Sequence, residues 1–335
     1  MQKKCFLILS IFLMFILSSC NITDESKSEH TKSDTSQQKI QDDSDEIYYS
    51  VSHGFTSEER EFIFDGEHPV TIPYFIKNGQ LDSEIGLCIY INGVQQLYTL
   101  DVQPEQSLMH IFSFSPSEGK EFEIKFIPNI GQKGDVLSVN ICTMLNPNYM
   151  LSNTNNVNFL PNHNLSSNTA VKLIMNEASV QTKTNNLESS KNYTTSQINS
   201  ELKESFIRKD DEENTERNML DTITFYYIYQ RNYDDGLLEV KDDIFSGNVD
   251  ILGKPGKYRV SIYYNHTLVP DAFNGLPFLD VELEKDNVIT CNVQFKVDTT
   301  KKLNHIYIIA TPIPEVFDEH TQVEKTKTKL VEVQQ

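Results

Sequence analysis

Short runs in which apolar and polar residues alternate fill the chain from Ile47 to Asn146. In residues 70–76 and 85–91 the apolar side chains recur at every second position, which predicts strands with one face toward a core. Asn92-Gly93 follows the second run and supplies the positive φ angles that a tight hairpin turn requires. Many short strands separated by close turns are typical of a β-sandwich or a barrel.

The chain from Met219 to Pro314 has the same pattern, and three of its segments align in order with three of the first unit. The aligned pairs are residues 86–92 with 259–265, 122–126 with 291–295, and 141–147 with 306–312. Inward positions keep their parity, since Leu87 matches Val260, whereas a slip by one residue would turn every side chain to the other face. Any two β domains share alternation, so chance similarity is the alternative. We therefore predict an all-β protein with two tandem immunoglobulin-like β-sandwich domains produced by internal duplication.

The segments between and beyond these units are richer in polar residues. The predicted units are a first sandwich at 47–178, a linker at 179–217, a second sandwich at 218–314 and a flexible tail at 315–335. The linker is expected to contain one short amphipathic helix, because four apolar residues recur there at helical spacing. They are Ile198, Leu202, Phe206 and Ile207.

The first twenty residues follow a third pattern. Lys3 and Lys4 precede an apolar run from Phe6 to Leu17, and small residues then lead to Cys20. These are the parts of a secretory signal. The run is too short for a spanning helix, which needs roughly 20 apolar residues; an uncut membrane anchor is the alternative. Residues 17–20, Leu-Ser-Ser-Cys, resemble the lipobox of bacterial lipoproteins. That resemblance implies a signal peptide at 1–19, cleavage before Cys20 and a diacylglyceryl group on its sulfur.

Residues 20–46 contain almost no apolar side chain after Cys20 and are predicted to form a disordered tether. Such a chain reaches on the order of 25–30 Å. The formal net charge of −19 argues against a nucleic-acid partner, because affinity for nucleic acid comes mainly from neutralised phosphates. The expected location is the extracytoplasmic face of the cell membrane, with the lipid on Cys20 as the attachment.

The sequence predicts no catalytic residue, no cofactor and no metal site. Ser117 and Lys120 have the Ser-x-x-Lys spacing of penicillin-recognising enzymes but fall in a Pro-Ser-Glu-Gly stretch that predicts a hairpin turn. Residues 232–236 are rich in oxygen atoms, and the choice there lies between an incomplete calcium loop and a plain turn. The histidines are scattered, with no pair at metal-ligand spacing. Those in the predicted folded part are His53, His68, His110, His163, His266 and His305.

Three cysteines remain after the signal peptide and the lipid site: Cys88, Cys142 and Cys291. An odd number cannot pair fully within one chain. A bridge between Cys88 and Cys142 and a pair of buried thiols both stay open as alternatives. In the alignment of the two units Ser261 stands where the first unit has Cys88, which argues against an essential nucleophile.

Aromatic residues supply the candidate binding surface. The chain has 15 tyrosines and 19 phenylalanines, and residues 225–229 place aromatic rings on both faces of one strand. Tyr226, Tyr229 and Tyr263 are the candidate binding-face residues, because aromatic rings offer large contact area; packing inside the sandwiches is the alternative.

Together these features favour a non-catalytic lipoprotein that binds or adheres to an envelope protein or glycan through its two modules. The folded part loosely resembles uncharacterised surface lipoproteins of low-GC Gram-positive bacteria. Other possibilities are an envelope hydrolase or its accessory subunit, and a structural spacer or assembly factor.

Overall fold

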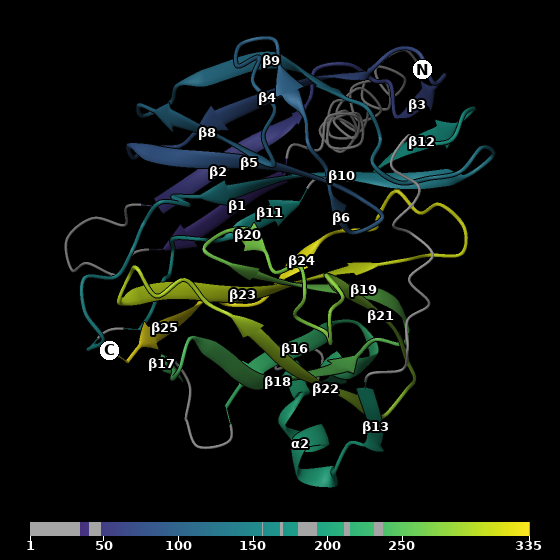
Figure 1. Cartoon of the computed structure of the whole chain (residues 1–335). Coiled ribbons are helices and arrows are strands. Elements are labelled where there is room, and N and C mark those ends of the chain that lie inside the picture. Colours follow the sequence, from purple (N-terminus) through teal and green to yellow (C-terminus); the bar gives the residue numbers. More distant parts are fainter. Residues whose placement is uncertain are drawn as a thin grey trace, which may run out of the picture.

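The computed structural model describes residues 34–39, 48–155, 157–167, 170–179, 193–210, 215–230 and 237–334. Strands dominate these residues, and the helices among them are α2 (Ser200–Ser205) and a 3-10 turn at Met219–Asp221. No helix in the described part is both long and apolar enough to cross a membrane. Figure 1 shows two β-sandwiches, the first in blue shades and the second in green to yellow, that meet near the middle of the molecule.

The first sandwich pairs two sheets around an apolar core. One sheet has the order β1 (Asp34–Lys39), β2 (Tyr48–Phe55), β4 (Val70–Asn78), β9 (Gly119–Phe126) and β7 (Thr99–Leu100). The other has the order β3 (Glu61–Phe64), β12 (Val171–Met175), β10 (Val136–Leu145), β5 (Ser83–Ile91) and β6 (Val94–Gln95). On the second sheet β8 (Met109–Phe114) pairs with β5, and β11 (Leu165–Ser167) pairs with β10.

The second sandwich is built in the same way around a core of its own. One sheet has the order β13 (Tyr193–Gln197), β22 (Asn287–Lys296), β18 (Ile244–Gly253) and β16 (Thr224–Tyr229). The other has the order β17 (Leu237–Val240), β25 (Lys329–Val333), β23 (Leu303–Pro312), β19 (Gly256–Tyr264) and β20 (Thr267–Leu268). Here β21 (Phe278–Leu283) pairs with β19, and β24 (Glu324–Lys325) pairs with β23. A separate hairpin joins β14 (Ile207–Asp210) to β15 (Thr215–Asn218).

The strand pairings of the two sandwiches correspond. The β10–β5 pair matches β23–β19, and in each unit the last strand adds to this sheet and runs parallel to an early strand: β12 to β3, and β25 to β17. In each unit the chain passes from a strand of one sheet to a short strand of the other sheet, which pairs in parallel with the last strand. This arrangement is an immunoglobulin-like topology. The predicted all-β fold of two such sandwiches is therefore confirmed.

The register corrects one of the aligned segments. Ile89 pairs with Ile141 in the first unit, and Ile262, its equivalent, pairs with Ile308 in the second. The equivalent of Ile141 is therefore Ile308, two residues beyond the position given by the sequence alignment. Because side chains alternate with a period of two, a slip of two residues left the inward parity unchanged.

The predicted flexible tail at 315–335 is wrong for its last part. Strand β25 pairs with both β17 and β23, and Leu330, Val331 and Val333 are buried. The strand completes the second sheet as β12 completes that of the first unit. The sequence prediction missed this strand because charged residues surround it. In the structure these residues lie outside the core.

Two further boundaries change. Residues 34–39 form β1 against β2, so the tether is not disordered throughout, while Cys20 and residues 1–33 and 40–47 lie outside the described residues. The linker helix is limited to α2, which Asn199 caps and which buries no residue. Strand β13 pairs with β22, so part of the predicted linker belongs to the second sandwich.

Candidate functional site at the junction of the two sandwiches

The sheet of each sandwich that carries its last strand also faces the other sandwich. A buried cluster of side chains that point away from both cores joins the two sheets. Its buried members are Cys88, Tyr90, Cys142, Met144, Tyr263, Tyr307, Ile309 and Val323. The rings of Tyr263 and Tyr307 stack in parallel with centroids 5.4 Å apart. These strands are therefore buried on both faces, one against a core and one at the junction.

Hydrogen bonds between the units add to this apolar contact. Arg259 Nη1 donates to the carbonyl of Asn92 at 3.2 Å, while its other nitrogens bind Asp280 with two contacts of 2.7 Å. Asn140 Nδ2 donates to the carbonyl of Thr321 at 2.6 Å. The junction thus combines a buried apolar centre with polar contacts, as specific interfaces do.

The three candidate tyrosines do not form one exposed face, so that prediction is wrong. Tyr263 is 1% exposed within the junction, and Tyr226 is 9% exposed with its hydroxyl donating to Glu324 at 3.1 Å. Tyr229 is partly buried, and its hydroxyl lies 3.4 Å from a carboxylate oxygen of Asp250. The predicted parity of β16 is confirmed, because Tyr226 and Ile228 are buried while Tyr227 is 41% exposed.

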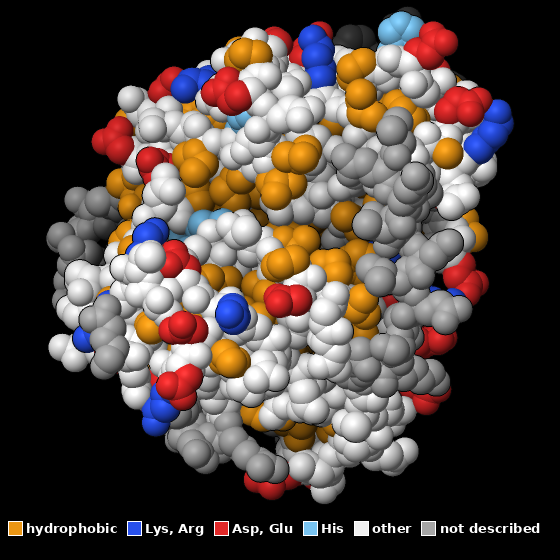
Figure 2. Space-filling model, viewed as in Figure 1, with side chains coloured by type: hydrophobic (Ala, Val, Ile, Leu, Met, Phe, Trp, Pro, Cys, Tyr) orange, Lys and Arg blue, Asp and Glu red, His pale blue; other side chains and the backbone are white. Residues whose placement is uncertain are grey.

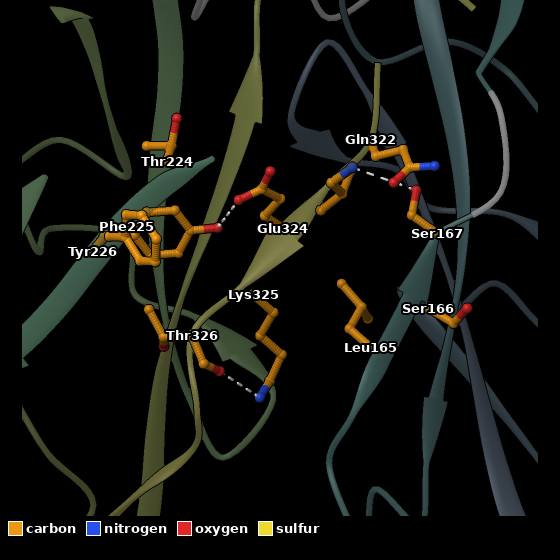
Figure 3. A pocket seen from close by; sticks show the side chains of 11 residues that line it. Leu165, Ser166, Ser167, Thr224, Phe225, Tyr226, Gln322, Glu324, Lys325 and Thr326 are labelled. Carbon is orange, nitrogen blue, oxygen red and sulfur yellow. Dashed lines mark hydrogen bonds between the residues drawn. The ribbon is translucent and has the colours of Figure 1, made fainter. Parts of the chain in front are cut away.

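A cleft opens where β16 approaches the first sandwich. Its larger cavity, about 620 Å³, lies between residues 157–165, Phe225–Ile228 and Lys325–Lys329. A second cavity of about 550 Å³ shares five of these residues and continues toward Ser167. Figure 3 shows this second cavity, with Tyr226 and Glu324 on one side and Leu165 and Ser166 on the other. Figure 2 shows hydrophobic side chains gathered across the middle of the molecule.

Lysines form one wall of the larger cavity, although the chain as a whole is acidic. Lys325, Lys327 and Lys329 all line it. Part of the Lys325 side chain faces the cavity, whereas Nζ is enclosed. Nζ donates to the carbonyl of Thr326 at 2.9 Å and to Thr328 Oγ1 at 2.7 Å, and it lies 4.4 Å from the Tyr307 ring centroid. Burial lowers the pKa of Lys325 to about 7.

Next to this wall the fold gathers three histidines that the sequence scatters. His163 comes from the segment before β11, His266 from the turn after β19, and His305 from β23. Their ring centroids lie 4.2 to 4.9 Å apart, and one nitrogen of each lies within 4.8 Å of the others. The prediction of scattered histidines without ligand spacing is therefore wrong for these three.

Two main-chain carbonyls orient the rings. His163 Nε2 lies 2.8 Å from the carbonyl of Tyr149, and His266 Nε2 lies 2.6 Å from that of Pro147. A carbonyl oxygen only accepts, so each Nε2 carries the proton and each Nδ1 presents a lone pair. His266 Nδ1 lies 3.0 Å from the Tyr307 hydroxyl, which donates to it. The Nδ1 atoms of His163 and His305 are buried without a hydrogen-bond partner.

The three rings are neutral near pH 7. Burial lowers the pKa of His163 to about 3 and that of His266 to about 4, and nearby positive charge adds to the effect. Burial and the two neighbouring histidines hold the pKa of His305 far below its ordinary value.

One cue for the cluster was present in the sequence. Asn265-His266 aligns with Asn92-Gly93, and the second residue of both turns has a positive φ, 61° for His266 and 78° for Gly93. Side chains other than glycine are uncommon in that conformation, so a histidine there is notable. No spacing rule could have joined it to His163 and His305, which lie far away in the chain.

Other sequence candidates are placed as follows. Ser117 lies in the turn between β8 and β9 with φ 64°, so the predicted turn is confirmed. It is not a hairpin turn, because β8 pairs with β5 in one sheet and β9 pairs with β4 in the other. Cys88 and Cys142 stand directly opposite each other on β5 and β10 as buried free thiols, as is Cys291. Residues 232–236 lie outside the described residues.

No protein-family model matches the chain, and a comparison with curated proteins finds no match. Solved structures that align with it include the periplasmic chaperone SfaE, at 9% identity and a TM-score of 0.21, over 85% of this chain and 100% of that one. A protein of unknown function from Porphyromonas gingivalis W83 aligns at 10% identity and a TM-score of 0.20, over 84% and 99% of the two chains. At these scores neither likeness bears on function.

Proposed function

We propose that this chain is a lipid-anchored, extracytoplasmic binding protein whose ligand site is the cleft between its two sandwiches. The observation that carries the proposal is the cavity of about 620 Å³ at the junction, within the size range of ligand pockets. Residues from both sandwiches line it, so the relative position of the two units defines the site. A rigid, shared cleft is a reason for keeping two modules in one chain.

The walls of the cleft suggest the chemistry of the ligand. Phe225 and Tyr227 offer aromatic surface, and Leu160 adds an exposed apolar side chain. The lysine wall opposite attracts negative charge. We propose that the ligand combines an apolar or ring-shaped body with an anionic group, as an acidic segment of an envelope glycan or protein does.

The anchor rests on the lipobox resemblance of residues 17–20. A lipid on Cys20 and a polar stretch after it would hold the cleft near the outer face of the membrane, where envelope ligands are present. The proposed role is binding or adhesion without catalysis.

The test is binding by the chain from Asn21 to Gln335, made without the lipid, to panels of acidic glycans and acidic peptides from envelope material. Affinity for any ligand found should fall about tenfold in Tyr227→Ala and in Lys327→Ala, which corresponds to about 1.4 kcal/mol. Matched controls are Ile63→Ala, an exposed apolar residue of β3, and Lys296→Ala, an exposed lysine of β22. If the affinity is unchanged in the two cleft variants and falls in the two controls, the ligand binds elsewhere.

A further inference from the structure

We propose that the Nδ1 atoms of His163, His266 and His305 bind one divalent transition-metal ion, Zn²⁺ in first place, at the junction of the two sandwiches. One ligand comes from the first sandwich and two from the second. The ion would therefore connect the two units directly. This inference does not depend on the proposed ligand cleft.

The hydrogen bonds of two rings match those of metal-binding histidines. A histidine that binds a metal through one nitrogen generally donates its other N–H to a carbonyl or carboxylate, which fixes the ring. His163 and His266 each make such a bond, to the carbonyls of Tyr149 and Pro147. Both bonds leave Nδ1 as the available ligand atom.

Unpartnered nitrogens are a second and independent observation. His163 and His305 are 1% and 3% exposed, and the Nδ1 of each has no hydrogen-bond partner. Buried polar atoms are nearly always paired, so two such atoms beside each other require a reason. A shared metal ion would satisfy both.

The distances require a modest contraction. One ring nitrogen of each histidine lies within 4.8 Å of the others, and the ring centroids lie 4.2 to 4.9 Å apart. Around a tetrahedral Zn²⁺ with bonds of about 2.0–2.1 Å, ligand nitrogens are about 3.3 Å apart. Small rotations of the rings can supply the difference, and His266 Nδ1 would exchange the Tyr307 hydroxyl for the ion.

The donor set selects the class of metal. Three imidazole nitrogens suit Zn²⁺, Cu²⁺ and Ni²⁺, whereas Ca²⁺ and Mg²⁺ require oxygen ligands. Three protein ligands leave a fourth tetrahedral position for water or another small ligand. His163 also lines the larger cavity, so the ion would lie at the wall of that cavity.

Two positive charges oppose an ion here: that of Lys325 acts on all three histidines, and that of Lys301 acts on His305. Lys325 is held at Nζ by two hydrogen bonds and the face of the Tyr307 ring. Its lowered pKa of about 7 allows the amine to become neutral when a cation binds nearby.

The experiment uses the full chain purified in detergent and stripped with a chelator. Zn²⁺ is titrated by calorimetry, and Co²⁺ is titrated by visible absorption, which reports a tetrahedral site. We expect one ion per chain and a thermal midpoint that rises with Zn²⁺. His163→Ala, His266→Gly and His305→Ala should each weaken binding at least tenfold and abolish the thermal shift.

His266→Gly is the sharpest of these variants, because the same turn of the first sandwich carries Gly93 with the same sign of φ. The turn can therefore form without the histidine ring. His68→Ala and His320→Ala remove exposed histidines and should leave the affinity unchanged. Absence of stoichiometric uptake by the wild-type chain, or uptake that survives in folded His266→Gly, would overturn the proposal.

Discussion

Tyr90 on β5 and Tyr263 on β19 occupy equivalent positions in the two sandwiches, and both are buried in one cluster at the junction with 1% of their surface exposed. Each lies two residues before the asparagine of its hairpin turn. The same outward face of the same strand is thus covered in both copies. The two units pack through equivalent sheets, which makes the junction part of the fold.

Replacing Tyr263 by Ala should destabilise the chain by about 3 kcal/mol, the scale found when a large buried aromatic side chain is removed. The ring packs against Tyr307 and is almost fully buried, so its removal leaves a cavity at the junction. Urea unfolding followed by far-UV circular dichroism measures the change. Tyr227→Ala is the control, because that ring is 41% exposed and its loss should cost less than about 0.5 kcal/mol. Equal effects of the two variants would contradict the buried junction.

Ending the chain after Lys327 should unfold the second sandwich or leave it insoluble. The truncation removes β25, and with it the ladder partner of β17 and of part of β23. It also exposes the core residues that Leu330, Val331 and Val333 cover. Thermal unfolding and solubility measure the effect, and a chain lacking only Gln335 is the control. An unchanged thermal midpoint in the truncated chain would show that this segment is a flexible tail, as the sequence predicted.

The sequence predicted the fold well where each strand buries one face. Leu87 and Val260 share a parity that alternation alone reveals, and both lie in the cores as expected. The prediction that Tyr263 is exposed was wrong, because alternation does not show whether the outward face of a strand contacts water or another domain. The nearly continuous apolar runs 87–91 and 306–310 were the available signal, since such runs are typical of strands buried on both faces.

The similarity of the two units was the available signal for the strand that the sequence analysis missed. Strand β12 lies within the predicted first unit, and its equivalent β25 follows Pro314. Each of these strands runs parallel to an early strand of its own unit. The histidine cluster had no comparable signal. His163, His266 and His305 converge only because the turn after β19 meets the segment before β11 across the junction, which is a tertiary contact.

Stability should rise with pH between about 7 and 8 because of Lys325. Its folded pKa is about 7, while an unfolded lysine has a pKa near 10.4. In this window the unfolded chain binds one more proton than the folded chain, so the free energy of unfolding increases with pH. The slope is on the order of 1 kcal/mol per pH unit. Burial raises the pKa of the Cys88 and Cys291 thiols to about 12, so ionisation of unfolded cysteines near pH 8.5 acts in the opposite direction at higher pH. Urea unfolding at several pH values below that range measures the slope.

Lys325→Met removes the titrating group and keeps much of the side-chain volume. We expect this variant to be more stable than the wild type at pH 7 and to lose most of the slope. Lys296→Met, an exposed site of β22, is the matched control and should keep the slope. A wild-type stability that stays flat from pH 7 to 8 would show that the Lys325 ammonium is well solvated in the folded state.

The proposed lipid anchor predicts a clear change in location. Cys20→Ala removes the only sulfur to which the lipobox resemblance assigns a lipid, so the chain should lose acylation and leave the membrane fraction. Metabolic labelling with a fatty-acid analogue and fractionation of cells measure both effects. Cys88→Ala is the control, because that thiol is buried at the junction and should not affect labelling. Retention of an unlabelled, uncleaved Cys20→Ala chain in the membrane would instead identify residues 6–17 as an ordinary hydrophobic anchor.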